Sequence, residues 1–281
     1  MRLFLLAALT MTAFAANSVL NRAAVGGGHM TAAMFALVRL WSGAACLSAL
    51  VWAGGSRLIP VRSDRLPRAL ALLAYMAGFS LAYRSIDAGS GALILFGGVQ
   101  ITMFCGALLA REPIPVRRWL GAGLAFLGLV VLLTPGRAEA IPLTAALSMA
   151  GAAIGWGIYS LLGRGSIDPV ADTGASFVLA ALGFSALVTV WPGVTLAADR
   201  SGVALAVVSG VITSGLGYAL WYRLLPGLGA SQAAVAQLTV PLIAATGGLL
   251  LLREGPGPVF LLAAAMVLGG VALALIPARR A

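Results

Sequence analysis

The sequence is short of charge and contains no lysine. Only 9% of its 281 residues are charged, whereas 61% are hydrophobic and the mean hydropathy is +1.03. Soluble domains carry roughly a quarter charged residues. A water-soluble fold could not bury this much apolar surface, so we expect a chain surrounded by lipid.

The charge that is present is one-sided, with 18 arginines against 8 acids and a net charge of +10. Such a balance can indicate nucleic-acid binding. Here the arginines lie in short loops between apolar runs, where positive charge sets the orientation of membrane proteins. We therefore expect the lipid bilayer as a partner and no nucleic acid.

Cysteine and histidine are scarce as well. Cys46 and Cys105 both fall inside apolar runs and are expected to be free thiols, and the only histidine is His29. No cluster of His, Cys and carboxylate side chains has the spacing of metal ligands. No glycine-rich phosphate loop follows a strand and opens a helix. The sequence thus predicts neither a metal site nor a cofactor.

All eight acidic residues lie in loops or at the ends of apolar runs. They are Asp64, Asp87, Glu112, Glu139, Asp168, Asp172, Asp199 and Glu254. No run holds a midspan carboxylate that could carry protons, or the paired acids or nucleophile–base pair that an intramembrane enzyme needs. We expect a protein that is not an enzyme, and the coupling of any transport stays open.

Ten apolar runs follow one another along the chain. They span residues 3–21, 31–54, 67–85, 89–110, 116–134, 142–163, 173–192, 202–222, 231–252 and 257–276. Each is about long enough to cross a bilayer as a helix. Helices satisfy their backbone polar groups within lipid, and no stretch shows the alternation of a membrane barrel. The sequence predicts an all-α integral membrane protein with ten transmembrane helices.

The chain repeats itself at a shift of 142 residues. Arg111-Glu112 then falls on Arg253-Glu254, in each case between two apolar runs. The first apolar run resembles a cleavable secretory signal. It also has a repeat partner, however, since Phe14 falls on Trp156. We therefore expect this run to belong to the mature fold.

Residues 1–138 and 139–281 are the two predicted repeats, each with five spans. Because five is odd, the second repeat enters the membrane from the opposite side, and the two halves are inverted. Inverted repeats around a central cavity are typical of secondary transporters, whose site lies near the midplane. Arginines are more frequent in the loops on the side of the N-terminus, so both termini are expected in the cytoplasm.

One face of the third run predicts the wall of a cavity. Tyr75, Phe79 and Tyr83 are spaced by four residues, and the repeat partners of the first two are Ser214 and Tyr218. Aromatic rings with a few hydroxyl groups suit a small molecule that has both apolar and polar parts. The alternative is a set of lipid-facing or interfacial aromatic residues, above all for Tyr83 near the end of its run.

Two further groups of residues are candidates for the same cavity. Trp156 and Tyr159 lie among small residues, which let helices approach closely, although ordinary helix packing explains them equally well. Asn17, Gln100 and Gln237 are amides within apolar runs. An amide without a partner is costly in hydrocarbon, so each is expected to face the interior or to bond a neighbouring helix.

Pro241 is the sharpest backbone signal, because proline removes an N–H and frees a carbonyl one turn earlier, near Gln237. Gly97-Gly98 lies at the matching place in the first half and predicts a second helix break there. Matched breaks in two halves point to a midplane site. The alternative is a harmless kink.

Arg39 is the one charge well inside a span. One hypothesis is that it attracts the carboxylate of a substrate. The other is structural, with Arg39 either snorkelling toward the membrane surface or capping freed carbonyls.

These features carry a resemblance to a known family. The stretches GYALWYR at 217–223, GAS at 229–231 and FALVR at 35–39 are similar to signatures of the EamA-type branch of the drug/metabolite transporter superfamily. The aromatic residues make the chain look most like the YddG-type amino-acid exporters within it. The small drug exporters of the superfamily depend on a glutamate in their first span, and this chain has none there.

The resemblance implies a ten-helix basket around a central cavity, with export of aromatic and other neutral amino acids across the cell's inner membrane. We expect alternating access between the inverted halves, for which a monomer is sufficient. The alternatives are a transporter of another metabolite class working by uptake or exchange, and a membrane scaffold without transport activity.

Overall fold

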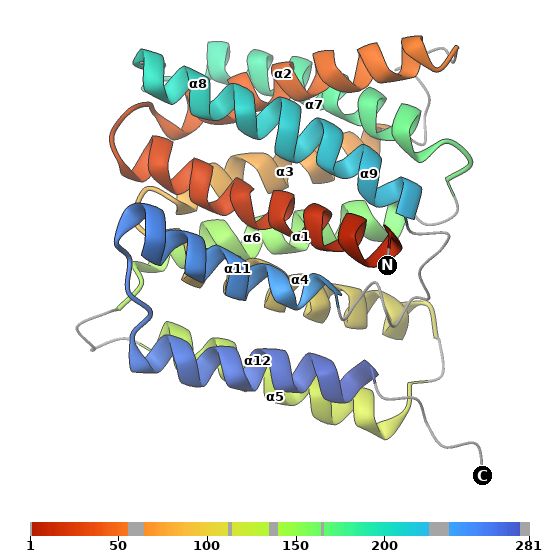
Figure 1. The fold of residues 1–281 in the computed structure, drawn as a ribbon, viewed down its shortest axis with the longest axis vertical. Helices are drawn as coiled ribbons and strands as arrows, with labels where there is room; N and C mark the ends of the chain where they lie inside the picture. The colour runs from red at the N-terminus through yellow and green to blue at the C-terminus, as the bar shows by residue number, and fades with distance from the viewer. Residues whose placement is uncertain are drawn as a thin grey trace.

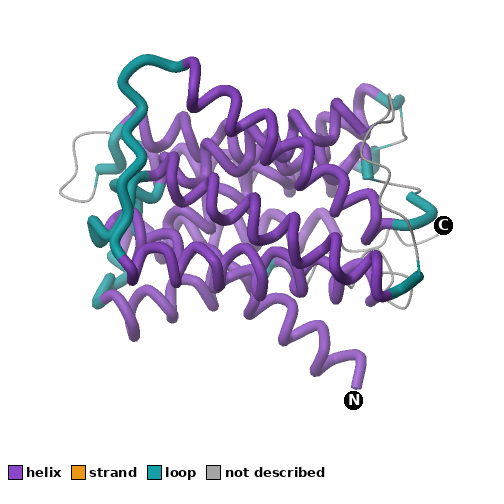
Figure 2. The backbone as a smooth tube through the Cα atoms, turned by 90° about the horizontal axis from the view of Figure 1, so that it is seen from above, coloured by secondary structure: helices purple, strands orange, loops and turns teal. Residues whose placement is uncertain are grey.

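The protein is a bundle of helices that run side by side (Figure 1). The computed structural model describes residues 2–55, 65–111, 114–134, 140–163, 166–224 and 236–275. Within them, helices form the body of the molecule and loops gather at its two ends (Figure 2). The one strand-like pairing among these residues is an isolated bridge between Met30 and Ala198.

The first half of the chain contains five α-helices and a short π-helical turn. They are α1 (Arg2–Asn21), η1 (Arg22–Gly26), α2 (Ala32–Ala53), α3 (Arg65–Ala82), α4 (Ala88–Leu109) and α5 (Val116–Leu133). α1 buries Met11, Phe14 and Asn17 against the rest of the bundle. The first apolar run is therefore part of the packed fold, as its repeat partner indicated.

The second half repeats this order with π-helical turns inside two of its spans. Its described elements are α6 (Leu143–Leu162), α7 (Pro169–Val190), α8 (Arg200–Val208), η2 (Ser209–Leu216), α9 (Gly217–Leu224), α11 (Thr239–Gly247), η4 (Gly248–Leu252) and α12 (Pro258–Leu275). α8, η2 and α9 form one continuous span, and so do α11 and η4.

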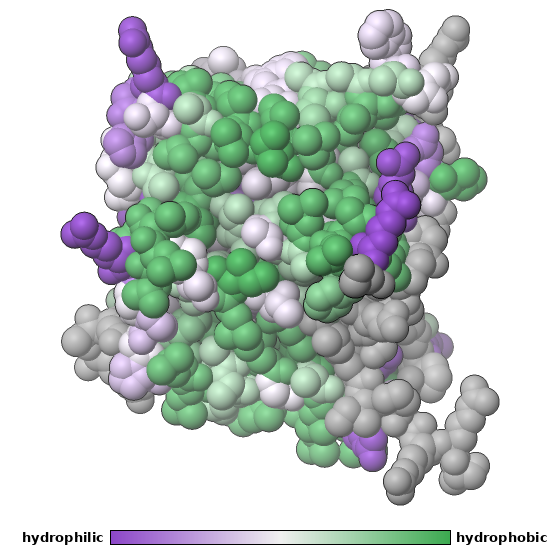
Figure 3. Space-filling model, in the orientation of Figure 1, coloured by the Kyte–Doolittle hydropathy of each residue, from purple (hydrophilic) through white to green (hydrophobic). Residues whose placement is uncertain are grey.

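Seven helices of the described residues are long and apolar enough to cross a membrane. Thr239–Leu252 and Pro258–Ala274 are apolar but shorter, and α3 is not among the seven. The predicted all-helical membrane fold is confirmed, while the number of ten spans stays a prediction. On the face that Figure 3 shows, apolar residues cover the middle, and the most hydrophilic residues lie toward the two sides where the helices end.

Side chains at the loop boundaries fix several helix starts. The Oγ1 of Thr31 accepts the N–H of Met34 at the start of α2. The carboxylate of Asp199 accepts the N–H of Gly202 at 2.8 Å, at the start of α8. Such caps satisfy backbone donors that the first helical turn leaves free.

Helices of the two halves pack against one another in matching pairs. α2 lies against α7, α4 against α11, and α5 against α12, and each of these pairs unites equivalent helices of the two halves. α3 packs on α6. In the same way, the span made of α8, η2 and α9 packs on α1. α5 and α12 form the lower edge of the bundle in Figure 1.

The contact between α5 and α12 is close because it runs over glycines. A Cβ atom at Gly270 would lie 2.5 Å from the carbonyl oxygen of Gly121, and one at Gly128 would lie 3.0 Å from that of Ala263. A shift of 142 residues converts one contact into the other. The backbone of α5 therefore approaches that of α12 at two equivalent contacts.

The expected helix break at Gly97-Gly98 is wrong. α4 continues through both glycines, from Ala88 to Leu109. A Cβ at Gly97 would lie 3.1 Å from the side chain of Val267, and one at Gly98 would lie 2.7 Å from that of Ala153. These glycines allow close packing of helices instead of interrupting their own.

Candidate functional site

A small cavity lies where α1, α3, α4, α6 and α9 meet. Its lining residues are Phe14, Asn17, Tyr75, Phe79, Leu95, Phe96, Trp156 and Tyr218. The space is about 10 Å³, which is room for about one water molecule. The structure therefore brings five of the predicted site residues together around a small space that residues of both halves of the chain line.

The aromatic rings of this cavity contact one another. The ring centroids of Tyr75 and Trp156 are 5.0 Å apart, and those of Trp156 and Tyr218 are 5.1 Å apart. Phe14 meets Tyr218 edge-on at 5.6 Å. Ring pairs at these separations stabilise one another beyond the burial of their surface. The rings form an almost closed apolar wall.

Asn17 supplies the polar side of the cavity and is itself held by the π-helical turn η2. Its Oδ1 accepts hydrogen bonds from Ser209 at 2.8 Å, from Thr213 and from Ser214 at 3.5 Å. Its Nδ2 donates to the carbonyl oxygen of Thr213 at 3.4 Å. π-helical turns are frequent at functional sites, and this one directs three hydroxyl groups at a single amide.

Arg39 lies directly behind the aromatic wall and is fully buried. Its Nε donates to Ser214 Oγ at 3.0 Å and its Nη2 donates to Tyr75 Oη at 3.2 Å. The centre of its guanidinium group is 5.0 Å from the ring of Phe79. Arg39 therefore does not snorkel to the surface, and its hydrogen bonds among the described residues go to hydroxyl groups and not to carbonyls. Its guanidinium group extends from α2 to side chains of α3 and η2 inside the bundle.

Three other predicted residues stand around the cavity without lining it. Ser214 connects Arg39 with Asn17. Tyr159 stacks on Trp156 at 5.4 Å and donates to Thr173 Oγ1 at 3.1 Å. Tyr83 is fully buried, so it does not face lipid.

The remaining predicted residues lie farther along their helices. Gln100 and Gln237 are half-buried and do not line the cavity. A turn at Leu238 precedes α11, and Pro241 is buried in the first turn of that helix, where its missing N–H breaks no helical bond. The helix is thus interrupted just before Pro241, close to the place that the sequence indicated.

Several cavity residues have no direct signal in the sequence. Leu95 and Phe96 lie in a run that is apolar on all sides, so no periodicity distinguishes their inner face. Phe14 could have been found, because its repeat partner is Trp156. Ser209 and Thr213 lie one helical turn apart, and both reach the amide of Asn17.

An ionic network closes the bundle at the end where Glu254 lies, here called the Glu254 end. Glu254 Oε1 pairs with Arg22 Nε at 2.5 Å, and Oε2 accepts the N–H of Ala88 at 2.8 Å. Arg22 also donates to the carbonyl oxygens of Tyr83 and Arg84, both at 3.3 Å. Glu254 therefore connects helix ends at this side of the bundle. Its repeat partner Glu112 lies outside the described residues.

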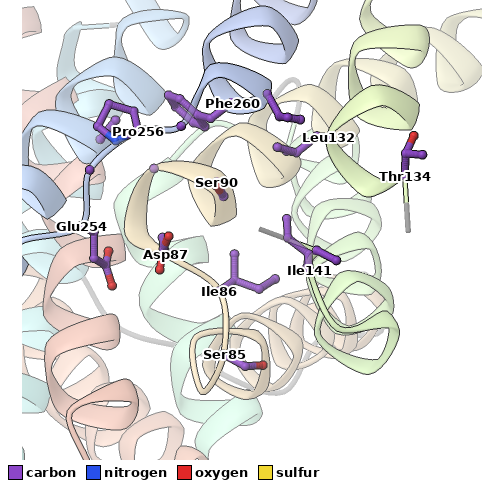
Figure 4. Close-up of a pocket in the computed structure, with 16 residues that line it drawn as sticks. Ser85, Ile86, Asp87, Ser90, Leu132, Thr134, Ile141, Glu254, Pro256 and Phe260 are labelled. Atoms are coloured by element: carbon purple, nitrogen blue, oxygen red, sulfur yellow. The ribbon is translucent and has the colours of Figure 1, made fainter. Parts of the chain in front are cut away.

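A larger cavity of about 370 Å³ opens beside this network (Figure 4). Ser85, Asp87 and Ser90 contribute polar groups, opposite Ile141 and Phe260. It lies among helix ends and loops, and it contains none of the predicted site residues. We take the inner cavity as the candidate site because buried polar and aromatic groups of both halves converge there.

The fold and the site define a multi-pass helical membrane protein with a small polar and aromatic interior site. The sequence pattern of the EamA-like transporter family matches residues 1–134 and again residues 143–276. The chain belongs to this family, whose members are transporters and not enzymes.

Relatives in other organisms cover much of the chain. An uncharacterized protein of Pseudomonas aeruginosa is 46% identical over 276 residues, which is 98% of this chain and 95% of that protein. An uncharacterized transporter of Archaeoglobus fulgidus is 25% identical over 177 residues, or 60% of this chain and 61% of the relative. A protein crystal structure with 21% identity has a TM-score of 0.64 over 97% of this chain and 99% of its own, which shows a shared fold.

Proposed function

We propose that the chain is a secondary transporter that exports small amphipathic metabolites, foremost aromatic and other neutral amino acids, across the inner membrane. The observation that carries this proposal is the inner cavity. Phe14 and Trp156 come from equivalent positions of the two halves, and so do Phe79 and Tyr218. A site shared between two repeats is the arrangement that alternating access uses.

The chemistry of the wall favours an amphipathic substrate. Flat rings offer apolar contact to a side chain, while Asn17 and the hydroxyl of Tyr75 offer hydrogen bonds. Gln100, Gln237 and Pro241 would come into contact with a substrate only as the cavity widens. With room for about one water molecule, the cavity has to widen before an amino acid fits.

Two further observations support inverted halves that move against each other. The family pattern occurs twice, over 1–134 and 143–276. The helix pairs and the glycine contacts of α5 with α12 are exchanged by the same shift of 142 residues. With both termini in the cytoplasm, the Glu254 end faces outward, and its ionic network has to open for release. A monomer contains the whole pathway.

Transport is tested in proteoliposomes that contain labelled phenylalanine. We expect efflux that requires the protein and falls at least tenfold in Trp156→Ala, which removes a central ring of the wall. The matched control is Trp52→Ala, because Trp52 is 82% exposed at the end of α2. Good transport of another metabolite class without any amino-acid transport would overturn the substrate. Absence of any transport would favour a scaffold.

A further inference from the structure

Arg39 is a buried charge without a counter-charge. Its side chain is 0% exposed, and it forms no ion pair within the described part of the chain. Its Nη1 is buried and has no hydrogen-bond partner. Burying an ion without a partner costs several kcal/mol in proteins. A fold that keeps such a group therefore has a use for its charge.

The neighbours of Arg39 neutralise it only in part. Its guanidinium centre is 5.0 Å from the ring of Phe79 and 5.5 Å from that of Tyr75. Aromatic faces attract a cation but carry no net charge. Both rings also line the inner cavity. The positive potential of Arg39 consequently reaches the cavity through a wall that screens it little.

The hydrogen bonds around Arg39 have a fixed direction. Arginine can only donate, so the oxygens of Tyr75 and Ser214 accept from it. The phenol of Tyr75 also shares a hydrogen bond with the phenol of Tyr218. Because the oxygen of Tyr75 accepts from Arg39, this pair of phenols keeps one O–H beyond its own bond. Ser214 in turn donates to Asn17 Oδ1, which already accepts from two other hydroxyls of η2.

This direction determines what the network can offer to a ligand. The oxygen of Asn17 is saturated, and one hydrogen of its amide nitrogen remains beyond the bond to Thr213. The bonded phenols of Tyr75 and Tyr218, together with the amide of Asn17, therefore offer donors to the cavity. Donors backed by a positive charge recognise an anion.

We propose that the inner cavity recognises its substrate by a carboxylate and rejects organic cations of the same size and shape. This inference rests on the proposed function and narrows its substrate class. Arg39 acts as a positioning residue that holds Tyr75 and Ser214 in their donor orientation. Arg39 has no charged repeat partner, since Ala181 stands at the equivalent position, so the selectivity comes from one half alone.

The test uses three probes that share a phenyl ring. They are phenylalanine, 3-phenylpropionate and phenethylamine, each measured at neutral pH for binding to the purified protein and for transport in proteoliposomes. We expect the two carboxylates to bind at least tenfold more tightly than the amine, as one hydrogen bond to a charged group requires. Equal or tighter binding of phenethylamine overturns the inference and leaves a transporter of amphipathic molecules in place. Binding of none of the three overturns the inference together with the amino-acid substrate.

Variants locate the source of the preference. Tyr75→Phe keeps the ring but removes the donor, and it should reduce the preference for carboxylate several-fold. Arg39→Gln should remove the preference, and Arg39→Lys should restore part of it through the retained charge. Tyr83→Phe is the control phenol, since its hydroxyl donates to the backbone of Ala88 and not to Arg39 or the cavity. An unchanged preference in folded Tyr75→Phe overturns the inference even where Arg39→Gln does not fold.

Discussion

Asn17 shows how much a single amide organises in an apolar interior. Its side-chain oxygen accepts hydrogen bonds from Ser209, Thr213 and Ser214, all within η2. The widened π-helical turn lets these hydroxyls face the same point. Removing the amide leaves buried hydroxyls without their acceptor, and each unsatisfied group costs about 1–3 kcal/mol.

We predict that Asn17→Leu lowers the free energy of unfolding by about 1–3 kcal/mol, measured by thermal unfolding in detergent. Thr12→Val is the control, because Thr12 is exposed on the same helix and bonds only the carbonyl of Ala8. A variant Asn17→Leu that is as stable as Thr12→Val would show that the hydroxyls find other partners.

At the scale of elements, the approach of α5 to α12 depends on side chains that are missing. The backbone oxygen of Gly121 lies only 2.5 Å from the place of a Cβ at Gly270, and that of Ala263 lies 3.0 Å from the place of a Cβ at Gly128. Within lipid, such close packing is a principal source of helix association, since no hydrophobic effect drives it.

We predict that Gly270→Val destabilises the protein by about 1–3 kcal/mol, because overpacking forces two backbones apart. Gly269→Val is the control because it makes the same substitution at the neighbouring residue. Gly269 is exposed, and nothing lies within 4 Å of a Cβ placed there. Folded yield and the melting temperature of the two variants measure the difference. Equal melting temperatures would contradict a tight contact at Gly270.

The starts of α2 and α8 are joined at the Glu254 end by a contact that responds to pH. Asp199 accepts the N–H of Gly202, then interacts with His29 Nδ1 at 2.8 Å, and both contacts lower the pKa of its carboxyl below the ordinary value of 3.8. A carboxyl with a lowered pKa stabilises the fold at higher pH, and this contribution is lost as the pH falls through its folded value.

We therefore predict that wild type is more stable than Asp199→Asn at pH 5, that the difference declines as the pH falls below 3.8, and that it is lost once the pH is below the lower folded pKa. The melting temperatures of wild type and Asp199→Asn, measured at a series of pH values from 5 downward, test this prediction. Because Asp199 is exposed, the difference in melting temperature is small and decreases with added salt. A difference that grows as the pH falls would contradict the assignment.

At the scale of the whole molecule, the network of Arg22 and Glu254 joins the ends of three spans. Glu254 follows η4, Arg22 follows α1, and the N–H of Ala88 opens α4. The Glu254 side chain is only 14% exposed, so water screens the pair less than it screens a surface pair. Opening this end of the bundle requires these contacts to break.

We predict that Glu254→Gln raises the rate at which an impermeant thiol reagent labels a cysteine at Ser90, which lines the adjoining cavity. If the closed form loses about 1 kcal/mol of stability, the labelling rate should rise roughly fivefold. The background variant lacks Cys46 and Cys105. Asp87→Asn is the control, because Asp87 is 54% exposed and meets Arg22 only at 3.5 Å. Equal labelling in both variants would show that Glu254 does not hold this end closed.

The sequence alone determined that the chain is helical and belongs in a membrane. Apolar runs and their charged boundaries are local properties, and lipid allows one local solution for the backbone, which is the helix. The repeat at a shift of 142 residues also identified Phe14 and Trp156 as equivalent positions from the sequence alone. The spacing of Tyr75 and Phe79 put both rings on one helix face, as the structure has them.

Only the tertiary structure decided what the ambiguous residues do. A glycine in a helix can break it or admit a neighbour, and Gly97 does the second because Val267 comes close to it. Arg39 could reach the surface or remain buried, and its bonds to Ser214 and Tyr75 depend on where α3 and η2 pack. Such contacts join residues far apart in the chain, so no local pattern contains them.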